Sequence, residues 1–317
     1  MPESHRFDFL EIRPKGSEQP SLRRVMRPRP ATEVDLTVRW RVVEIIGQPG
    51  AALGEFNTPA GMWVDRQGNL FVADSFNHRL QKITPDGEVS GLGSRGKGWQ
   101  EFLYPQAVVV DGNGFAYVLD QGNHRIAKIS PTGAFLSHWG TAGSLPGFLN
   151  APCSLALDHF GNIYVADTGN SRIQVFTTTG NFVETFGRGY AFNRPQSVYV
   201  SENSGVFVAD TLNHRIVQFD RSGTPLRVLG GYGHEIGRLH GPCAVVVDRR
   251  GNVYVADNGN ARVQVFNPRG EPAVILQRHS VPNFLLTAPA GLALAPDGAL
   301  YVADAGAHRV IKLQTVS

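Results

Sequence analysis

One unit of sequence recurs six times along this chain of 317 residues. Each unit opens with a proline, found at Pro59, Pro105, Pro152, Pro195, Pro242 and Pro289. An aspartate follows in every unit, at Asp74, Asp120, Asp167, Asp210, Asp257 and Asp304. An arginine lies five residues further on, at Arg79, Arg125, Arg172, Arg215, Arg262 and Arg309. All three rows step by 46, 47, 43, 47 and 47 residues, so the register is shared. Such a period predicts a propeller or solenoid built from repeated supersecondary units.

The third unit shows the strand pattern most clearly. Residues 152–158, 163–167 and 172–176 are rich in Val, Ile, Leu, Tyr and Phe, and Gly/Asn/Asp turns separate them. A fourth run of this kind, 182–186, precedes the next proline. Consecutive runs with such turns are typical of antiparallel hairpins. Six units therefore predict an all-β fold, a six-bladed β-propeller with four antiparallel strands in each blade.

The two ends of the repeat array predict how the ring closes. The sixth unit stops near residue 313, after its third strand, and an additional strand, 38–46, precedes the first unit. We expect this N-terminal strand to pair into the last blade, because closure removes the exposed sheet edges that cause aggregation. The predicted propeller thus spans residues 38–317, and residues 1–37 form a separate arm.

The turn after the central strand carries a resemblance to a known family. The segments Asp74–Arg79, Asp120–Arg125 and Asp210–Arg215 each contain Asn-His-Arg. They resemble the NHL repeat, with Arg in the place of the final Leu. The resemblance covers all six units and implies a six-bladed β-propeller. Its members bind proteins or RNA, sense ligands, or act as a zinc-dependent amidating lyase, so the fold alone does not decide the function.

Composition and cysteine positions limit the environment of the protein. The net charge is +3, which does not by itself indicate nucleic-acid binding, and no apolar run is long enough to span a membrane. The first residues lack a signal-peptide pattern, so we expect a cytoplasmic protein unless a leader was removed. Cys153 and Cys243 fall in the third and fifth blades, too far apart for a disulfide, which predicts free thiols.

Two kinds of repeated polar residue are interpreted as structural. Histidines occupy one turn position in four units, and Ser171 and Ala261 take that position where the remaining motif is kept; these histidines are His78, His124, His214 and His308. The Asp and Arg rows occur in all six units and predict a hydrogen-bonded pair that ties the second strand to the third. Copies at six distant places favour a framework role over catalysis.

The position after each proline is predicted to begin the innermost strand at the rim of the central channel. It is occupied by small or weakly polar residues, of which Gln106, Cys153, Gln196 and Cys243 are the candidate channel-rim residues. The lyases of the family need several histidines to hold zinc, and only His240 lies near this rim. We therefore expect no catalytic residue, no side-chain metal site and no cofactor. An ion held by backbone carbonyls stays open.

The connections between units differ most from one another, and they hold the candidate interaction residues. These connections join each outer strand to the next inner strand, so they share one face of the ring. Aromatic residues lie there among Arg, Lys and His, a composition that protein interfaces and base-stacking surfaces share: Trp99, Trp139, Tyr190, Tyr232 and Phe284. Packing between the blades is the alternative role for these rings.

Residues 1–37 contain five prolines and no repeat, which predicts an extended arm. Its basic part carries Arg23, Arg24, Arg27 and Arg29 without an acidic neighbour. The arm is interpreted as a tether to a partner, or as a disordered leader.

Together, these features predict a non-enzymatic interaction protein. It is expected to be a rigid scaffold that binds a protein partner or larger assembly through its loop face and arm. RNA binding is one alternative, and a small-ligand sensor or metal-dependent lyase that uses the channel is another. The repeat pattern leaves the oligomeric state open.

Overall fold

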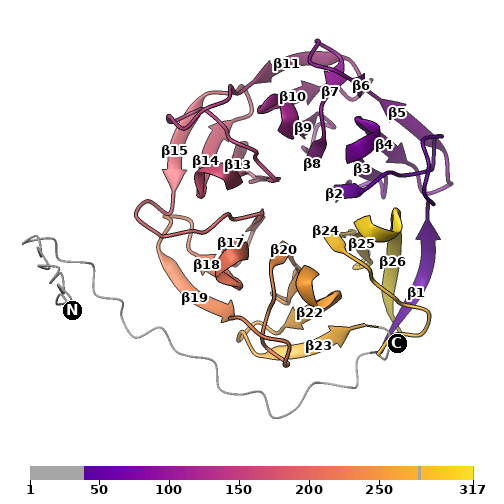
Figure 1. The fold of residues 1–317 in the computed structure, drawn as a ribbon, viewed down its shortest axis with the longest axis vertical. Helices are drawn as coiled ribbons and strands as arrows, with labels where there is room; N and C mark the ends of the chain where they lie inside the picture. The colour runs from indigo at the N-terminus through magenta and orange to yellow at the C-terminus, as the bar shows by residue number, and fades with distance from the viewer. Residues whose placement is uncertain (1–38, 278–279, 317) are drawn as a thin grey trace, which may run out of the picture.

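The chain forms a closed ring of six four-stranded antiparallel sheets, as the computed structural model shows (Figure 1). The structure describes residues 39–277 and 280–316. Within each blade the strands follow one another from the channel outward, so the first strand of every unit is innermost. This arrangement confirms the all-β, six-bladed β-propeller that the repeat pattern predicts.

The strands and short 3-10 turns follow the repeat closely. Blade 1 contains β2 (Pro59–Val64), β3 (Leu70–Asp74), η1 (Ser75–Asn77), β4 (Arg79–Ile83) and β5 (Val89–Leu92). Blade 2 contains β8 (Pro105–Val110), β9 (Ala116–Asp120), η2 (Gln121–Asn123), β10 (Arg125–Ile129) and β11 (Phe135–Trp139). Blade 3 contains β12 (Ser154–Leu157), β13 (Asn162–Asp167), η3 (Thr168–Asn170), β14 (Arg172–Thr177) and β15 (Phe182–Phe186).

The remaining three blades have the same order. Blade 4 contains β16 (Ser197–Ser201), β17 (Gly205–Asp210), η4 (Thr211–Asn213), β18 (Arg215–Phe219) and β19 (Pro225–Gly230). Blade 5 contains β20 (Pro242–Val247), β21 (Val253–Asp257), η5 (Asn258–Asn260), β22 (Arg262–Phe266) and β23 (Pro272–Leu276). Blade 6 contains β24 (Pro289–Leu294), β25 (Leu300–Asp304), η6 (Ala305–Ala307), β26 (Arg309–Val316) and β1 (Arg39–Ile46).

Strand β1 closes the ring in the predicted way. It pairs antiparallel with β26 from Arg39 opposite Val316 to Ile46 opposite Val310. The indigo N-terminal strand therefore lies outermost in the yellow C-terminal blade (Figure 1). The arm predicted for residues 1–37 lies outside the described residues.

The hydrophobic core is distributed between the blades. Each of six buried clusters draws its side chains from two neighbouring blades, and one of them joins blade 6 to blade 1. The bulky residue three positions before most unit-opening prolines fills such a cluster, as Phe56, Phe102, Leu149 and Leu239 do with no exposed surface. A single blade cannot bury both of its faces, so stability requires the closed ring.

The connections between blades and the η turns share one side of the ring, which we call the loop face. It comprises residues 47–58, 93–104, 140–151, 187–196, 231–241, 277 and 280–288, with η1 to η6. A two-stranded parallel sheet, β6 (Ser94–Arg95) with β7 (Glu101–Phe102), shapes one of these connections. Single parallel bridges shape three others.

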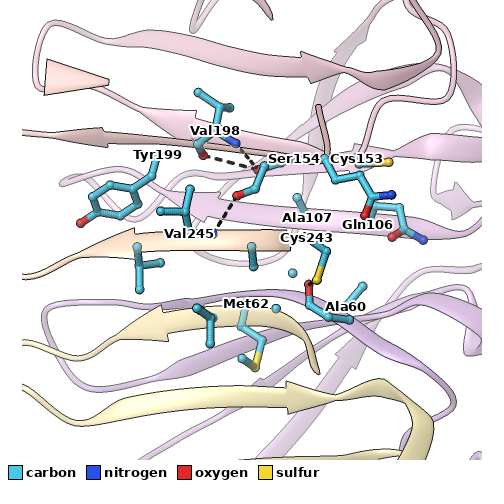
Figure 2. A pocket seen from close by; sticks show the side chains of 18 of the residues that line it. Ala60, Met62, Gln106, Ala107, Cys153, Ser154, Val198, Tyr199, Cys243 and Val245 are labelled. Carbon is cyan, nitrogen blue, oxygen red and sulfur yellow. Dashed lines mark hydrogen bonds between the residues drawn. The ribbon is translucent and has the colours of Figure 1, made fainter. Parts of the chain in front are cut away.

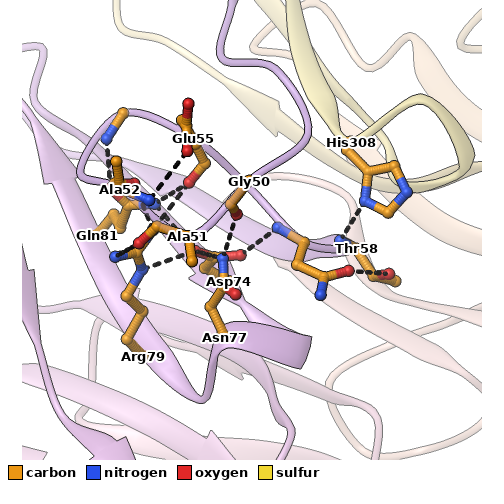
Figure 3. A network of polar contacts seen from close by, with 12 residues as sticks. Gly50, Ala51, Ala52, Glu55, Thr58, Asp74, Asn77, Arg79, Gln81 and His308 are labelled. Carbon is orange, nitrogen blue, oxygen red and sulfur yellow. Dashed lines mark hydrogen bonds and ion pairs between the residues drawn. The ribbon is translucent and has the colours of Figure 1, made fainter.

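The repeat Asp–Arg pair anchors these connections (Figure 3). In blade 1 the Nε of Arg79 donates to Asp74 at 2.7 Å, and the guanidinium also donates to the carbonyl oxygens of Ala51, Ala52 and Glu55. The other carboxylate oxygen of Asp74 accepts the backbone N–H of Asn57 at 2.7 Å. The pair recurs in all six blades with the aspartate fully buried, which agrees with the framework interpretation.

The repeated histidines link neighbouring blades. The Nδ1 of His78 accepts the N–H of Tyr104 in the next blade, and His308 accepts that of Thr58 across the ring closure. His124 and His214 make the same bond to Ala151 and Gly241. Each histidine adopts a left-handed backbone conformation at the end of its η turn. The structural interpretation of these histidines is therefore confirmed.

The hydrogen bonds from the repeat arginine to the loop carbonyls lead to a prediction that can be tested by comparing two blades. Arg172 donates to three loop carbonyls at 2.8 Å, whereas Arg215 reaches one, Ala191, at 3.5 Å. Both arginines pair with a buried aspartate. We expect Arg172→Ala to lower the unfolding free energy by about 2 kcal/mol more than Arg215→Ala, because additional charged hydrogen bonds are lost. Denaturant unfolding measures the difference; equal losses would show that the arginines do not hold the loops.

Small residues allow the innermost strands to approach one another at the channel. A Cβ added to Gly61 would lie 2.6 Å from the carbonyl oxygen of Gln106 and 2.8 Å from the Cα of Ala107. Backbone atoms of the next blade cannot move without shifting that blade. The corresponding position in blade 6, Gly291, would meet the carbonyl oxygen of Ala60 in the same way.

Gly61→Ala is expected to destabilise the ring by about 1–3 kcal/mol, the usual cost of overpacking a tight interface. Gly112→Ala is the matched control, because a Cβ there meets no atom within 4 Å and the backbone is not left-handed. Thermal unfolding of the two variants provides the measurement. A melting temperature of Gly61→Ala equal to that of Gly112→Ala would contradict the close approach.

Candidate functional site

The ring encloses a central cavity of about 540 Å³ (Figure 2). Inner-strand residues from all six blades line it, and apolar side chains such as Met62, Val198 and Val245 form its walls. The four candidate rim residues meet here as expected: Gln106, Cys153, Gln196 and Cys243 all line this cavity. A concave site of this size, lined by all six blades, could enclose a small molecule.

Most polar groups at the rim are already used in bonds between blades. The side-chain amide of Gln106 donates to Ser75 of blade 1 at 2.9 Å, and the thiol of Cys243 donates to the carbonyl oxygen of Pro289 at 3.0 Å. Thr168 and Thr211 donate to the proline carbonyls of the following blades, at 2.7 and 2.8 Å. These rim groups therefore contribute to ring closure.

The two cysteines are free thiols, as the sequence predicts. Burial raises the pKa of Cys243 to about 12 and also raises the pKa of Cys153. The thiolate is the reactive form of cysteine. Because a raised pKa keeps both thiols protonated near neutral pH, neither is activated as a nucleophile.

The donor set does not match the zinc site of the lyases in the family. Among the described residues, no group of three or more His, Cys, Asp or Glu side chains is placed to hold a metal ion. No Asp, Glu, Lys or Arg side chain lines the cavity. The ionisable groups on its wall are thiols, the Tyr199 phenol and the imidazoles of His214 and His240.

The five candidate aromatic residues separate into two groups. Trp99 and Tyr232 lie on the loop face with exposed fractions of 51% and 62%. Trp139 ends strand β11 and packs edge-on against Tyr117, and Tyr190 contacts Phe192 and Phe219. Phe284 has no exposed surface and belongs to the cluster between blades 5 and 6. These last three rings contribute to packing between blades.

Further exposed apolar residues share the loop face with Trp99 and Tyr232, and sequence reasoning missed them. Of the sixteen exposed large hydrophobic side chains among residues 39–277 and 280–316, eight belong to the loop face: Leu53, Phe76, Trp99, Leu145, Leu212, Tyr232, Ile236 and Leu285. Of the other eight in these ranges, six lie on outermost strands, Val316 ends β26, and Phe160 lies on the opposite turns. The positions of the loop-face residues in the connections and η turns were a usable signal, but the prediction was restricted to aromatic residues of the connections.

Two other expectations concern residues beyond this site. The arm residues Arg23, Arg24, Arg27 and Arg29 lie outside the described part of the chain. Across residues 39–277 and 280–316, no helix has the length and apolar character needed to cross a membrane.

Comparison with known proteins agrees with the repeat pattern. The family model of the NHL repeat matches residues 56–83, 149–176, 192–219, 239–266 and 286–313. Blade 2, which lies between the first two matches, has the same Asp120–Arg125 pair and His124 link as its neighbours. Among curated proteins, no sequence relative of the chain was found.

Solved structures with a similar fold include both enzymes and binding proteins. A streptogramin B lyase has 12% sequence identity and a TM-score of 0.62, covering 90% of this chain and 100% of that chain. An inactive variant of virginiamycin B lyase from Staphylococcus aureus, solved with quinupristin, has 13% identity and a TM-score of 0.61, covering 88% of each chain. An auxiliary nutrient binding protein from Bacteroides ovatus has 14% identity and a TM-score of 0.63, covering 88% of this chain and 78% of that chain.

These identities establish similarity of fold alone. The repeat matches, the six blades and the conserved geometry of the turn agree with one another. The chain therefore contains five NHL repeats and folds as a six-bladed β-propeller.

Proposed function

We propose that this propeller is a non-enzymatic interaction protein that binds a protein partner through its loop face. The observation that supports this proposal is the gathering of exposed apolar side chains on that face. Trp99 and Tyr232 are the anchor residues, because large aromatic side chains provide most of the binding energy in protein interfaces. Leu53, Leu212 and Ile236 are further exposed apolar residues of the same face.

The loop face is suited to binding because its backbone is fixed before a partner arrives. Three carbonyl oxygens of the connection 47–58 accept hydrogen bonds from Arg79, and the Trp99 connection is held by Arg125 in the same way. A rigid surface loses little conformational entropy on association, which leaves more of the contact energy for affinity.

The charge of the loop face favours a protein over RNA. Its described connections carry five basic side chains, Arg95, Lys97, Arg188, Arg194 and Arg238, against three acidic ones, Glu55, Glu101 and Glu235. Contacts to phosphates dominate RNA affinity and require a stronger basic surface. RNA binding is therefore the alternative that the experiment must distinguish from protein binding. The arm is proposed as a second contact to the same partner, from its sequence alone.

The test is an affinity pull-down from native lysate with and without RNase, comparing a Trp99→Ala, Tyr232→Ala double variant with Phe160→Ala. Phe160 is the matched control, since it is 71% exposed on the opposite side of the ring. We expect the double variant to lose a protein that Phe160→Ala retains, because each anchor contributes about 2 kcal/mol. A chain lacking residues 1–37 tests the arm.

Two outcomes would contradict the proposal. Recovery that collapses with RNase in every sample would favour the RNA alternative. A partner that both variants retain, or that Phe160→Ala alone loses, would place the interface elsewhere on the ring.

A further inference from the structure

The central cavity departs from the sixfold pattern at one place. In blades 1, 2, 3 and 6 it is lined by inner-strand residues and the residues directly before them. Between blades 4 and 5 it extends toward the loop face and is lined in addition by turn and connection residues. This part of the cavity, which we call the mouth lobe, is formed by Thr211, Leu212, His214, His240, Asn258 and Gly259.

The blade 4–blade 5 junction has a histidine at the mouth lobe that the other junctions lack. His240 occupies the position of Asn57, Leu103, Asn150, Asn193 and Thr287 in the other units. Its ring lies over Gly259, where an added Cβ would come within 2.6 Å of the imidazole Cγ. The ring of His214 lies 5.6 Å from that of His240, and Tyr232 packs against both rings, at 4.9 and 5.3 Å.

The two imidazoles present hydrogen-bond donors. The Nδ1 of His214 accepts the N–H of Gly241 at 3.0 Å, so the neutral ring has its proton on Nε2. The Nδ1 of His240 is buried without a hydrogen-bond partner among the described residues. Orphaned N–H groups are rarer in protein interiors than under-satisfied acceptors, which favours the Nε2 position for the proton of the neutral His240 ring as well. Neither Nε2–H has an acceptor within the described part of the chain.

The charged residues in and around the mouth lobe determine which kinds of ligand it can bind. No carboxylate lines the cavity, so an ammonium group would have no counter-charge, and no Lys or Arg lines it to hold a phosphate. The aspartates behind the lobe, Asp210 and Asp257, are fully buried and paired with Arg215 and Arg262. Glu235 and Arg238 lie in the adjacent connection, outside the cavity lining. The remaining wall combines apolar side chains with uncharged polar ones, such as Gln106 and Gln196.

We propose that the mouth lobe and the channel beneath it bind a small uncharged molecule with an apolar body and one hydrogen-bond-accepting head group, a ketone. The head group accepts from the Nε2–H groups of His214 and His240, and the apolar body lies along the channel wall. A cavity of about 540 Å³ is of the size that encloses small organic ligands. This site is separate from the protein interface proposed above.

The experiment measures binding to the purified full-length chain with three probes of similar size, heptan-2-one, hexanoate and hexylamine. Calorimetric titration gives the affinities, and NMR of protein labelled with ¹⁵N in histidine reports on the imidazoles. We expect heptan-2-one to bind and to shift the Nε2 signals of His214 and His240. Hexanoate and hexylamine are expected not to bind, because no charged side chain lines the cavity to pair with either of them.

Two variants with matched controls assign the site. His240→Leu installs the residue that blade 2 carries at this position, Leu103, so the fold should be retained while affinity falls about tenfold, because leucine has no hydrogen-bond donor. His214→Gln is compared with His124→Gln, which removes the same link between blades at a junction away from the lobe. Thermal unfolding of every variant verifies that it is folded.

The proposal is overturned by any of three results. The first is that heptan-2-one does not bind, the second is that hexanoate or hexylamine binds as tightly as heptan-2-one, and the third is that His124→Gln weakens binding as much as His214→Gln. Because these measurements use purified protein and small probes, a failure here leaves the pull-down result for the loop face unaffected, and the reverse also holds.

Discussion

The buried carboxylate of the repeat aspartate is the group on which the architecture depends. Asp74 has no exposed surface, and its two oxygens accept from Arg79, Asn77, Gln81 and the backbone of Asn57. A carboxylate without such partners would be very costly to bury, so the turn, the third strand and the preceding connection must all be in place together. The arginine then fixes the loop carbonyls. One charge pair in each blade thus ties the second strand to the third, and in blades 1, 2, 3 and 5 its arginine also holds the connection through three carbonyl oxygens.

Closure of the ring couples the Asp–Arg pairs of the six blades, so that they form cooperatively. Every hydrophobic cluster lies between two blades, and the histidine links and threonine–proline bonds cross the same boundaries. A ring of equal junctions provides a rigid frame but no specificity. Specific binding must come from the positions where junctions differ, such as Trp99 and Tyr232 on the loop face and His240 at the channel mouth. The proposed protein interface and the proposed ligand lobe both rest on such differences.

Much of the fold could be predicted because its signals repeat in register. The shared spacing of proline, aspartate and arginine predicted six blades, and the unpaired strand at 38–46 predicted the closure by β1. The site was less accessible to sequence reasoning. Tyr190 and Phe284 occupy connections just as Trp99 does, yet their rings turn inward. Whether a loop side chain packs or points outward depends on space left by the neighbouring blade, which one unit of sequence does not encode.

The sequence by itself determined the number of blades, the order of their strands, the framework role of the Asp–Arg pair and the free state of the two thiols. These follow from local patterns that recur at a fixed period. Only the tertiary structure decided which apolar residues remain exposed and which imidazoles face the channel. His240 lies near His214 and Tyr232 because closing the ring brings the end of one connection against the turn of the preceding blade. Such contacts between units depend on the ring's geometry, and for that reason they appear only in the folded chain.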